Sequence, residues 1–176
     1  MSPSAKMKPP VGANDHVQGT ANAPVTLVEY GDYQCPYCGE AYPIVKALQE
    51  RLGKQVRFVF RNFPLSEMHP HAEHAAEAAE AAGAQGKFWE MHDMLYENQD
   101  ALEDADLARY AKALKLDVPR FIKEMESHHY AERVRGDFSS GVRSGVNGTP
   151  SFFINGARHD GPFDLGSLLA AIEEAA

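Results

Sequence analysis

The stretch Val25-Thr-Leu-Val-Glu-Tyr30-Gly-Asp-Tyr-Gln-Cys35-Pro-Tyr-Cys38 decides the fold of this chain. Its first six residues are mostly apolar and β-branched, which is typical of a buried strand. The residues from Gly31 to Gln34 predict a loop. From Pro36 to Leu52 the apolar residues follow helical spacing, and Gly53 is a typical helix stop. The sequence therefore predicts a strand, a loop and a helix, with two cysteines at the junction.

Cys35 and Cys38 are the only cysteines among the 176 residues. Two are too few for a disulfide-stabilised scaffold and are half the ligands of an all-cysteine zinc site. The N-terminus of a helix stabilises a thiolate, so we expect Cys35 to have a lowered pKa and to act as the nucleophile. Cys38 follows one turn later and can close a disulfide with Cys35. A redox-active dithiol is the favoured interpretation, and incidental cysteines or half a metal site are the alternatives.

Further strands and helices are expected after this unit. A second strand is expected over 55–63 and a hairpin over 151–160, where Asn155-Gly156 is a strong turn signal. Between them the periodicity predicts about five helices, and Asp164 caps a last helix to about residue 174. The expected order is β-α-β, a helical insert, then β-β-α. The five helices of the insert are predicted at 72–82, 87–98, 105–116, 119–126 and 130–144.

This order suggests a division into three parts. Residues 1–22 lack periodicity and contain many Pro, Gly, Ser and Asn residues, so they are interpreted as a flexible arm. Residues 23–63 and 146–176 form one α/β domain, and residues 64–145 form a helical subdomain inserted into it. Within the insert, Glu73, Glu77 and Glu80 are interpreted as a solvated helix face.

The composition excludes several classes of protein. A net charge of −8 and a pI near 5.4 argue against a nucleic-acid surface, which needs clustered Lys and Arg. No apolar stretch approaches the roughly 20 residues of a membrane-spanning helix. No secretory leader is visible either, so the sequence indicates a cytoplasmic protein, or the mature form of an exported one.

Four features together resemble a known family. The segment Cys35-Pro-Tyr-Cys38 follows an apolar strand, and Pro43 lies five residues after the second cysteine, inside the predicted helix. Thr149-Pro150 directly precedes the strand that begins at Ser151. A long helical segment lies between Asn62 and Val146. The chain resembles the DsbA-like thiol-disulfide oxidoreductases of the thioredoxin superfamily, which implies a central mixed β-sheet flanked by helices, with an inserted helical subdomain.

The resemblance also implies a substrate-binding region. It implies a cis peptide bond before Pro150, whereas a trans proline opening a strand is the simpler interpretation of the local sequence. In the cis form the backbone of Thr149 would face the peptide groove and pair with substrate as an added strand. Pro36 and Tyr37, between the cysteines, are expected to contact substrate as well. Tyr33 and Phe152 are further candidates for the rim of this groove.

Glu29 is a polar residue inside the predicted buried strand. A buried carboxylate needs a partner or a raised pKa. DsbA-like proteins carry an acid below the disulfide, so the resemblance assigns Glu29 as the proton acceptor for Cys38. The alternative is an acid at a sheet edge with access to solvent. Asp32 is a second candidate acid, although a turn role is its simpler interpretation.

The expected activity is disulfide exchange with protein thiols through Cys35 and Cys38, without a bound cofactor and with an unidentified partner that recharges the pair. The intervening dipeptide is Pro-Tyr, and Tyr37 cannot add the positive charge of a histidine. We therefore expect a less acidic Cys35 than in the strongest oxidants, which leaves the direction of exchange open. The alternatives are a cytoplasmic reductase recharged by thioredoxin reductase or glutathione, and a peptide- or metal-binding module without turnover.

Three histidines cluster in the sequence, His69, His71 and His74. Zinc could take two of them together with Glu73 or Glu77. No metalloprotease-type His-Glu-x-x-His motif accompanies them, and capping and surface roles suit the start of a helix equally well. We therefore expect no metal site from this cluster.

Overall fold

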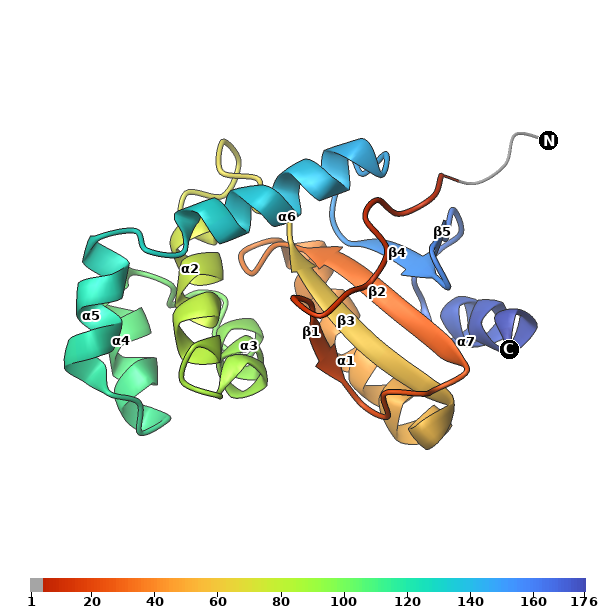
Figure 1. Cartoon of the computed structure of the whole chain (residues 1–176), viewed down its shortest axis with the longest axis horizontal. Helices are drawn as coiled ribbons and strands as arrows, with labels where there is room; N and C mark the ends of the chain where they lie inside the picture. The colour runs from red at the N-terminus through yellow and green to blue at the C-terminus, as the bar shows by residue number, and fades with distance from the viewer. Residues whose placement is uncertain (1–4) are drawn as a thin grey trace.

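The computed structural model describes residues 5–176, and its centre is a mixed five-stranded sheet (Figure 1). The strand order is β1-β3-β2-β4-β5. β2 and β3 run parallel, whereas β1 pairs with β3, β4 with β2 and β5 with β4 in antiparallel fashion. The fold class expected from the sequence is confirmed. The strands are β1 (His16–Gln18), β2 (Val25–Gly31), β3 (Val56–Asn62), β4 (Ser151–Ile154) and β5 (Ala157–Arg158).

Two helices pack on one face of the sheet, α1 (Pro36–Leu52) and α7 (Leu165–Ala175). The buried cluster on this face joins Leu27 of β2 to Leu48 of α1 and Leu168 of α7. Because side chains alternate along a strand, Glu29 shares this face with Leu27. The acid therefore lies on the side of the sheet where α1 carries the cysteines.

The opposite face of the sheet is covered by α6 (Ala131–Arg143) and by the N-terminal segment (Figure 1). Val28 of β2 packs in a buried cluster with Met7 and Val146, and Phe138 of α6 packs against this cluster. The expected flexible arm over 1–22 is therefore wrong for residues 5–22, which cover the sheet and supply β1. The strand β1 was not predicted because its three residues, His16 to Gln18, are too few to show the alternation of a strand. Residues 1–4 of the arm lie outside the described residues.

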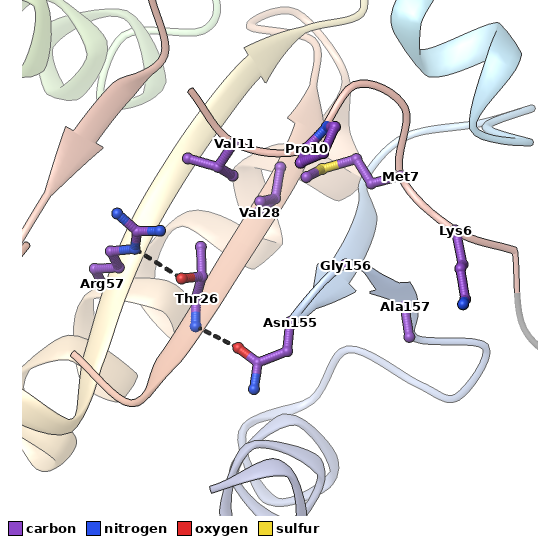
Figure 2. Close-up of a pocket in the computed structure, with 10 residues that line it drawn as sticks. All are labelled: Lys6, Met7, Pro10, Val11, Thr26, Val28, Arg57, Asn155, Gly156 and Ala157. Carbon is purple, nitrogen blue, oxygen red and sulfur yellow. Dashed lines mark hydrogen bonds between the residues drawn. The ribbon is translucent and has the colours of Figure 1, made fainter. Parts of the chain in front are cut away.

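A cavity of about 420 Å³ lies between the N-terminal segment and the sheet (Figure 2). Met7, Pro10 and Val28 line its apolar part. Its polar border is already paired, since Arg57 Nε donates to Thr26 Oγ1 at 2.7 Å and Thr26 N donates to Asn155 Oδ1 at 2.9 Å. None of the site residues expected from the sequence lines this cavity.

The helices expected between β3 and β4 are present, and they begin and end within a few residues of the expected positions (Figure 1). The alanines of α2 allow close packing, and all of them are buried. The expectation of a solvated face over Glu77 and Glu80 is wrong, because their exposed fractions are 2% and 5%. Both pair with histidines from distant segments. Besides α6, the insert contains α2 (Ala72–Gly83), α3 (Phe88–Tyr96), α4 (Asp104–Ala113) and α5 (Val118–Glu126).

No helix within residues 5–176 has the length and hydropathy needed to span a bilayer. The division into three parts remains a prediction, apart from the packing of residues 5–22 on the sheet.

Candidate active site

The two cysteines occupy the position predicted from the sequence, at the start of α1. Cys35 is the N-cap residue, and Pro36 is in the first turn, where its missing N–H leaves no hydrogen bond unmade. Both sulfurs are free thiols in this structure. Cys35 is 3% exposed and Cys38 is completely buried, while Pro36 and Tyr37 between them are exposed. The surface at the cysteines is therefore formed by Pro36 and Tyr37, while the two sulfurs lie beneath it.

The pKa values of the two thiols are shifted in opposite directions. The pKa of Cys35 is lowered to about 5, first by its hydrogen bond with Cys38, then, against the effect of burial, by Thr149 and the backbone amides of Cys38 and Tyr37. The pKa of Cys38 is raised well above its ordinary value by burial, by the bond with Cys35 and by the charge of Glu29. Near neutral pH the pair therefore consists of one thiolate and one thiol, with the thiolate on Cys35.

Glu29 lies beneath this pair without a full set of partners. Its side chain is 2% exposed, and its Oε2 makes no hydrogen bond to the described residues. Burial raises the pKa of Glu29 to about 8, and the negative charge of Cys35 adds to the effect. The alternative of a solvent-exposed acid at a sheet edge is wrong, because β2 is an inner strand between β3 and β4. A carboxyl with this pKa can release and take up a proton near neutral pH.

Thr149-Pro150, the third feature of the resemblance, also lies at the cysteines. The Thr149–Pro150 peptide bond is cis, as the resemblance implies. Cys35 Sγ lies 3.6 Å from the carbonyl oxygen of Thr149 and donates to it in the thiol form. Both Thr149 and Pro150 are half-buried, so one side of this segment is open to solvent.

Asp32 has a larger role than the turn expected from the sequence. Its carboxylate is 1% exposed and accepts hydrogen bonds from the amides of Gln34 and Cys35, at 2.7 and 3.1 Å. It also accepts from the amide of Leu65 at 2.9 Å and pairs with Nδ1 of His69 at 2.8 Å. Asp32 therefore fixes the cysteine loop and attaches the start of the helical insert to it. Its place at the end of a buried strand was the available signal.

Gln99 is a site residue that the sequence analysis missed. Its Nε2 donates to the carbonyl oxygens of Tyr33 and Cys35, at 3.0 and 2.9 Å. It reaches the cysteine loop from the connection between α3 and α4. No motif or periodicity marks this residue, because its function depends on the packing of the insert against the loop.

The apolar surface beside the cysteines differs from the expectation. Tyr33 and Phe152 are buried core residues, with exposed fractions of 1% and 2%, so they do not rim a groove. Tyr37 and Met68 are the exposed apolar residues of this region, at 61% and 72%. Tyr37 follows the Asp32 loop, and Met68 precedes His69, which binds Asp32. The two exposed side chains thus belong to segments joined through one carboxylate.

The structure does not gather His69, His71 and His74 into one site. His69 pairs with Asp32, whereas His74 pairs with Asp104 of α4 at 2.9 Å. The backbone amide of His71 donates to Gln34. The first two histidines therefore belong to the surroundings of the cysteine loop, and His74 belongs to a different part of the insert.

Comparison with known proteins identifies the family of this chain. Residues 12–174 match the model of a protein family described as "Thioredoxin". The chain is 49% identical over 161 residues to the Na(+)/H(+) antiporter NhaA 3 of Salinispora tropica, covering 92% of this chain and 24% of that protein. The chain thus spans about a quarter of the length of the curated relatives it matches.

Solved structures share the fold over nearly the whole chain. BdbD from Bacillus subtilis in its oxidised form is 25% identical, with a TM-score of 0.86 and 98% of each chain covered. The alpha-DsbA1 of Wolbachia pipientis has the same fold at 20% identity, with a TM-score of 0.80, covering 95% of this chain and 93% of that one. With the C-x-x-C pair at the start of α1 and the inserted helices, the chain belongs to this thioredoxin family and shares its fold with the DsbA-like structures.

Proposed function

We propose that this chain exchanges disulfides with protein substrates through its Cys35-Pro-Tyr-Cys38 pair. The observation that carries the proposal is the contrast between the two thiols. Cys35 has a pKa of about 5 at a helix N-terminus, next to exposed residues, and Cys38 is buried behind it with a raised pKa. A stabilised thiolate is both a nucleophile and a good leaving group.

The oxidising direction proceeds in two exchanges. A substrate thiolate attacks Sγ of Cys35 in the Cys35–Cys38 disulfide, forming a mixed disulfide and releasing Cys38, which takes a proton from Glu29. A second substrate thiolate then attacks the substrate sulfur of the mixed disulfide and releases the Cys35 thiolate. The substrate gains one disulfide and loses two electrons, which the Cys35–Cys38 pair receives. The reducing direction is the reverse, with Glu29 accepting the proton of Cys38.

Substrate binding is expected along the segment before Pro150. The carbonyl of Thr149 lies 3.6 Å from Cys35, where an extended peptide whose cysteine is bonded to Cys35 can pair with it as an added strand. The exposed apolar side chains of Tyr37 and Met68 lie in adjoining segments and suit the apolar surfaces of incompletely folded substrates.

The acidity of Cys35 favours net oxidation. A stabilised thiolate stabilises the dithiol form and thereby raises the reduction potential. A pKa of about 5 lies between the values of roughly 7 for thioredoxin and roughly 3.5 for DsbA. We therefore propose an oxidant weaker than DsbA, which suits the exported alternative for its location, together with a partner that removes the electrons.

The reduction potential of the pair tests the direction. Insulin reduction and oxidative refolding of a reduced protein are assayed in parallel with it. A potential well above about −270 mV, with faster refolding than insulin reduction, supports the oxidant. A potential near −270 mV or below contradicts it and favours a cytoplasmic reductase recharged by thioredoxin reductase or glutathione.

Two serine variants test the mechanism itself. Cys35→Ser should abolish turnover in both assays, whereas Cys38→Ser should accumulate a mixed disulfide with a disulfide substrate because it lacks the thiol that attacks Cys35. Turnover that survives in Cys35→Ser would refute the proposed chemistry. Substrate binding without turnover in the wild type would indicate a peptide-binding module instead.

A further inference from the structure

The helical insert brings together a second group of reactive side chains. His74 and Glu77 lie one turn apart on α2 and share a face of that helix. His128 joins them from the connection between α5 and α6. One ligand atom from each of the three residues lies within 4.8 Å of the other two. The sequence suggested His69 and His71 as the companions of His74, and the fold supplies His128 instead.

The distances within the group fit a metal ion. Nδ1 of His128 lies 3.1 and 3.4 Å from the two carboxylate oxygens of Glu77. Two ligands of a tetrahedral zinc ion, each bonded at about 2.0–2.1 Å, are separated by roughly 3.3 Å. The ring of His74 lies 5.5 Å from the ring of His128, centroid to centroid. The three ligand atoms, which lie within 4.8 Å of one another, would close to about 3.3 Å around a bound ion.

An outer carboxylate orients the first histidine. Nδ1 of His74 is 2.9 Å from Oδ1 of Asp104. A histidine that donates one ring N–H to a carboxylate has its other nitrogen available for a metal, and this arrangement is usual around zinc. Nε2 of His74 is therefore the nitrogen that Asp104 leaves for an ion.

The backbone at His128 is strained in a way that serves the cluster. Its φ is 51°, in the left-handed region that favours glycine or asparagine at the end of a helix. A histidine at this position after α5 is less favourable than a glycine would be. Strain of this kind is concentrated at functional sites. Here the conformation directs the His128 ring towards Glu77.

A cavity of about 360 Å³ adjoins the cluster. His74 and His128 line it, together with the apolar side chains of Phe121, Ile122 and Met125. Glu77 is buried beneath the two histidines, at 2% exposed. An ion held by these three ligands would lie at the border of the cavity, with a fourth position left for water or a small ligand.

We propose that His74, Glu77 and His128 bind one divalent metal ion, with zinc as the best match to two imidazoles and one carboxylate. Asp104 is a positioning residue for His74. The ion would join α2 to the connection between α5 and α6, and would therefore stabilise the insert.

The test is a titration of the purified protein with zinc chloride near pH 7.5. The protein is first oxidised to the Cys35–Cys38 disulfide, so that the thiols cannot bind the metal. We expect one zinc ion per chain and a higher melting temperature with zinc. Cobalt(II) should bind in competition with zinc and give the visible absorption of a tetrahedral site.

Adjacent histidines provide a matched pair of variants. His128→Asn keeps a residue that tolerates the left-handed conformation, and we expect at least a tenfold weaker zinc affinity and no rise in melting temperature. His129 is exposed and outside the cluster, so His129→Asn should bind zinc like the wild type. Asp104→Asn should weaken binding about tenfold while leaving one site per chain.

Three results would overturn the proposal. The first is the absence of saturable zinc binding by the wild type. The second is equal binding by the wild type and His128→Asn. The third is an equal loss of affinity in His128→Asn and His129→Asn. Any of these would reduce the cluster to ordinary ion pairs of His74 with Asp104 and of His128 with Glu77.

Discussion

Two buried glutamates, Glu29 in the sheet and Glu80 in the insert, have opposite surroundings. Glu80 is 5% exposed, and its oxygens contact Nε2 of His16 at 2.9 and 3.0 Å and accept a hydrogen bond from Nδ2 of Asn62 at 2.9 Å. Burial alone would raise the pKa of Glu80, but these bonds and the charge of Arg133 hold it below its ordinary value. Glu29 is equally buried, has an oxygen without a partner, and has a pKa raised to about 8.

This difference separates a structural acid from a chemical one. A buried carboxylate that accepts several hydrogen bonds is held in its charged form and ties segments together. A buried carboxylate with a missing partner changes its protonation near neutral pH and is therefore suited to proton transfer. Glu80 connects the N-terminal segment, β3 and α6 to α2, whereas Glu29 lies below two thiols that exchange protons.

Removing the charge of Glu80 should produce the largest loss of stability. Glu80→Gln takes the counter-charge from the partly buried side chains of His16 and Arg133 and an acceptor from buried Asn62, so we expect the free energy of unfolding at pH 7 to fall by about 2–4 kcal/mol. The pKa of Glu80 is lowered in the folded state, so this contribution is present above the unfolded pKa and is lost as the pH falls through the folded value. Urea unfolding of the oxidised protein at pH 7 and pH 3.5 measures it. An unchanged free energy at pH 7 would show that the network does not stabilise the fold.

Glu29→Gln should have the opposite effect on stability. The pKa of Glu29 is raised, so its favourable contribution is present below the unfolded pKa of about 4.5 and is lost as the pH rises through about 8. Each pKa unit is worth about 1.4 kcal/mol, and the disulfide form lacks the Cys35 charge, so we expect the variant to exceed the wild type by about 2–4 kcal/mol at pH 9. The two should be equal near pH 4. Unfolding in urea at both pH values checks this. A variant that is less stable than the wild type at pH 9 would indicate that another group stabilises the charged carboxylate of Glu29.

The same substitution should slow proton transfer at Cys38. Without Glu29, the mixed disulfide is expected to resolve at least tenfold more slowly at pH 7, and the defect should shrink at high pH, where hydroxide removes the proton. Stopped-flow measurement of the reaction with a small disulfide follows this step. Glu80→Gln, assayed under conditions where it is folded, is the matched control and should resolve at the wild-type rate. Equal rates in all three proteins would assign Glu29 a structural role only.

Titration of Cys35 examines the thiolate that Glu29 faces. We expect the rate of alkylation by iodoacetamide to rise with a midpoint near pH 5. Because this pKa is lowered on folding, the thiolate stabilises the folded dithiol above the unfolded pKa, and this advantage is lost as the pH falls through about 5. In Glu29→Gln the midpoint should stay near pH 5, because Glu29, with a pKa of about 8, is already neutral where Cys35 titrates. A midpoint near the ordinary value of a thiol would contradict the assigned nucleophile.

The sequence predicts one side of the Glu29–Glu80 comparison better than the other. The strand Val25–Tyr30 and the cysteines at the helix start are local patterns, so they place Glu29 in the core beneath the pair. The exposure predicted for Glu80 was wrong because its spacing on a helix is that of a solvated face. Its partners His16 and Asn62 come from segments that only the tertiary fold brings together. Gln99 was missed for the same reason, since no local pattern encodes a contact across the insert.

The smallest effect is expected from the dipeptide. Tyr37→His adds a positive charge near Cys35, which should lower the pKa of that thiol and raise the reduction potential of the pair. Tyr37 is 61% exposed, so solvent screens the charge, and we expect a shift of less than about one pKa unit. Alkylation titrations of the two proteins compare them, with Tyr37→Phe as the uncharged control. A small shift would show that the buried bonds from Cys38 and Thr149 set the acidity of Cys35. A much larger fall in the pKa of Cys35 would instead show that the exposed dipeptide, rather than these buried bonds, sets the acidity of the thiol.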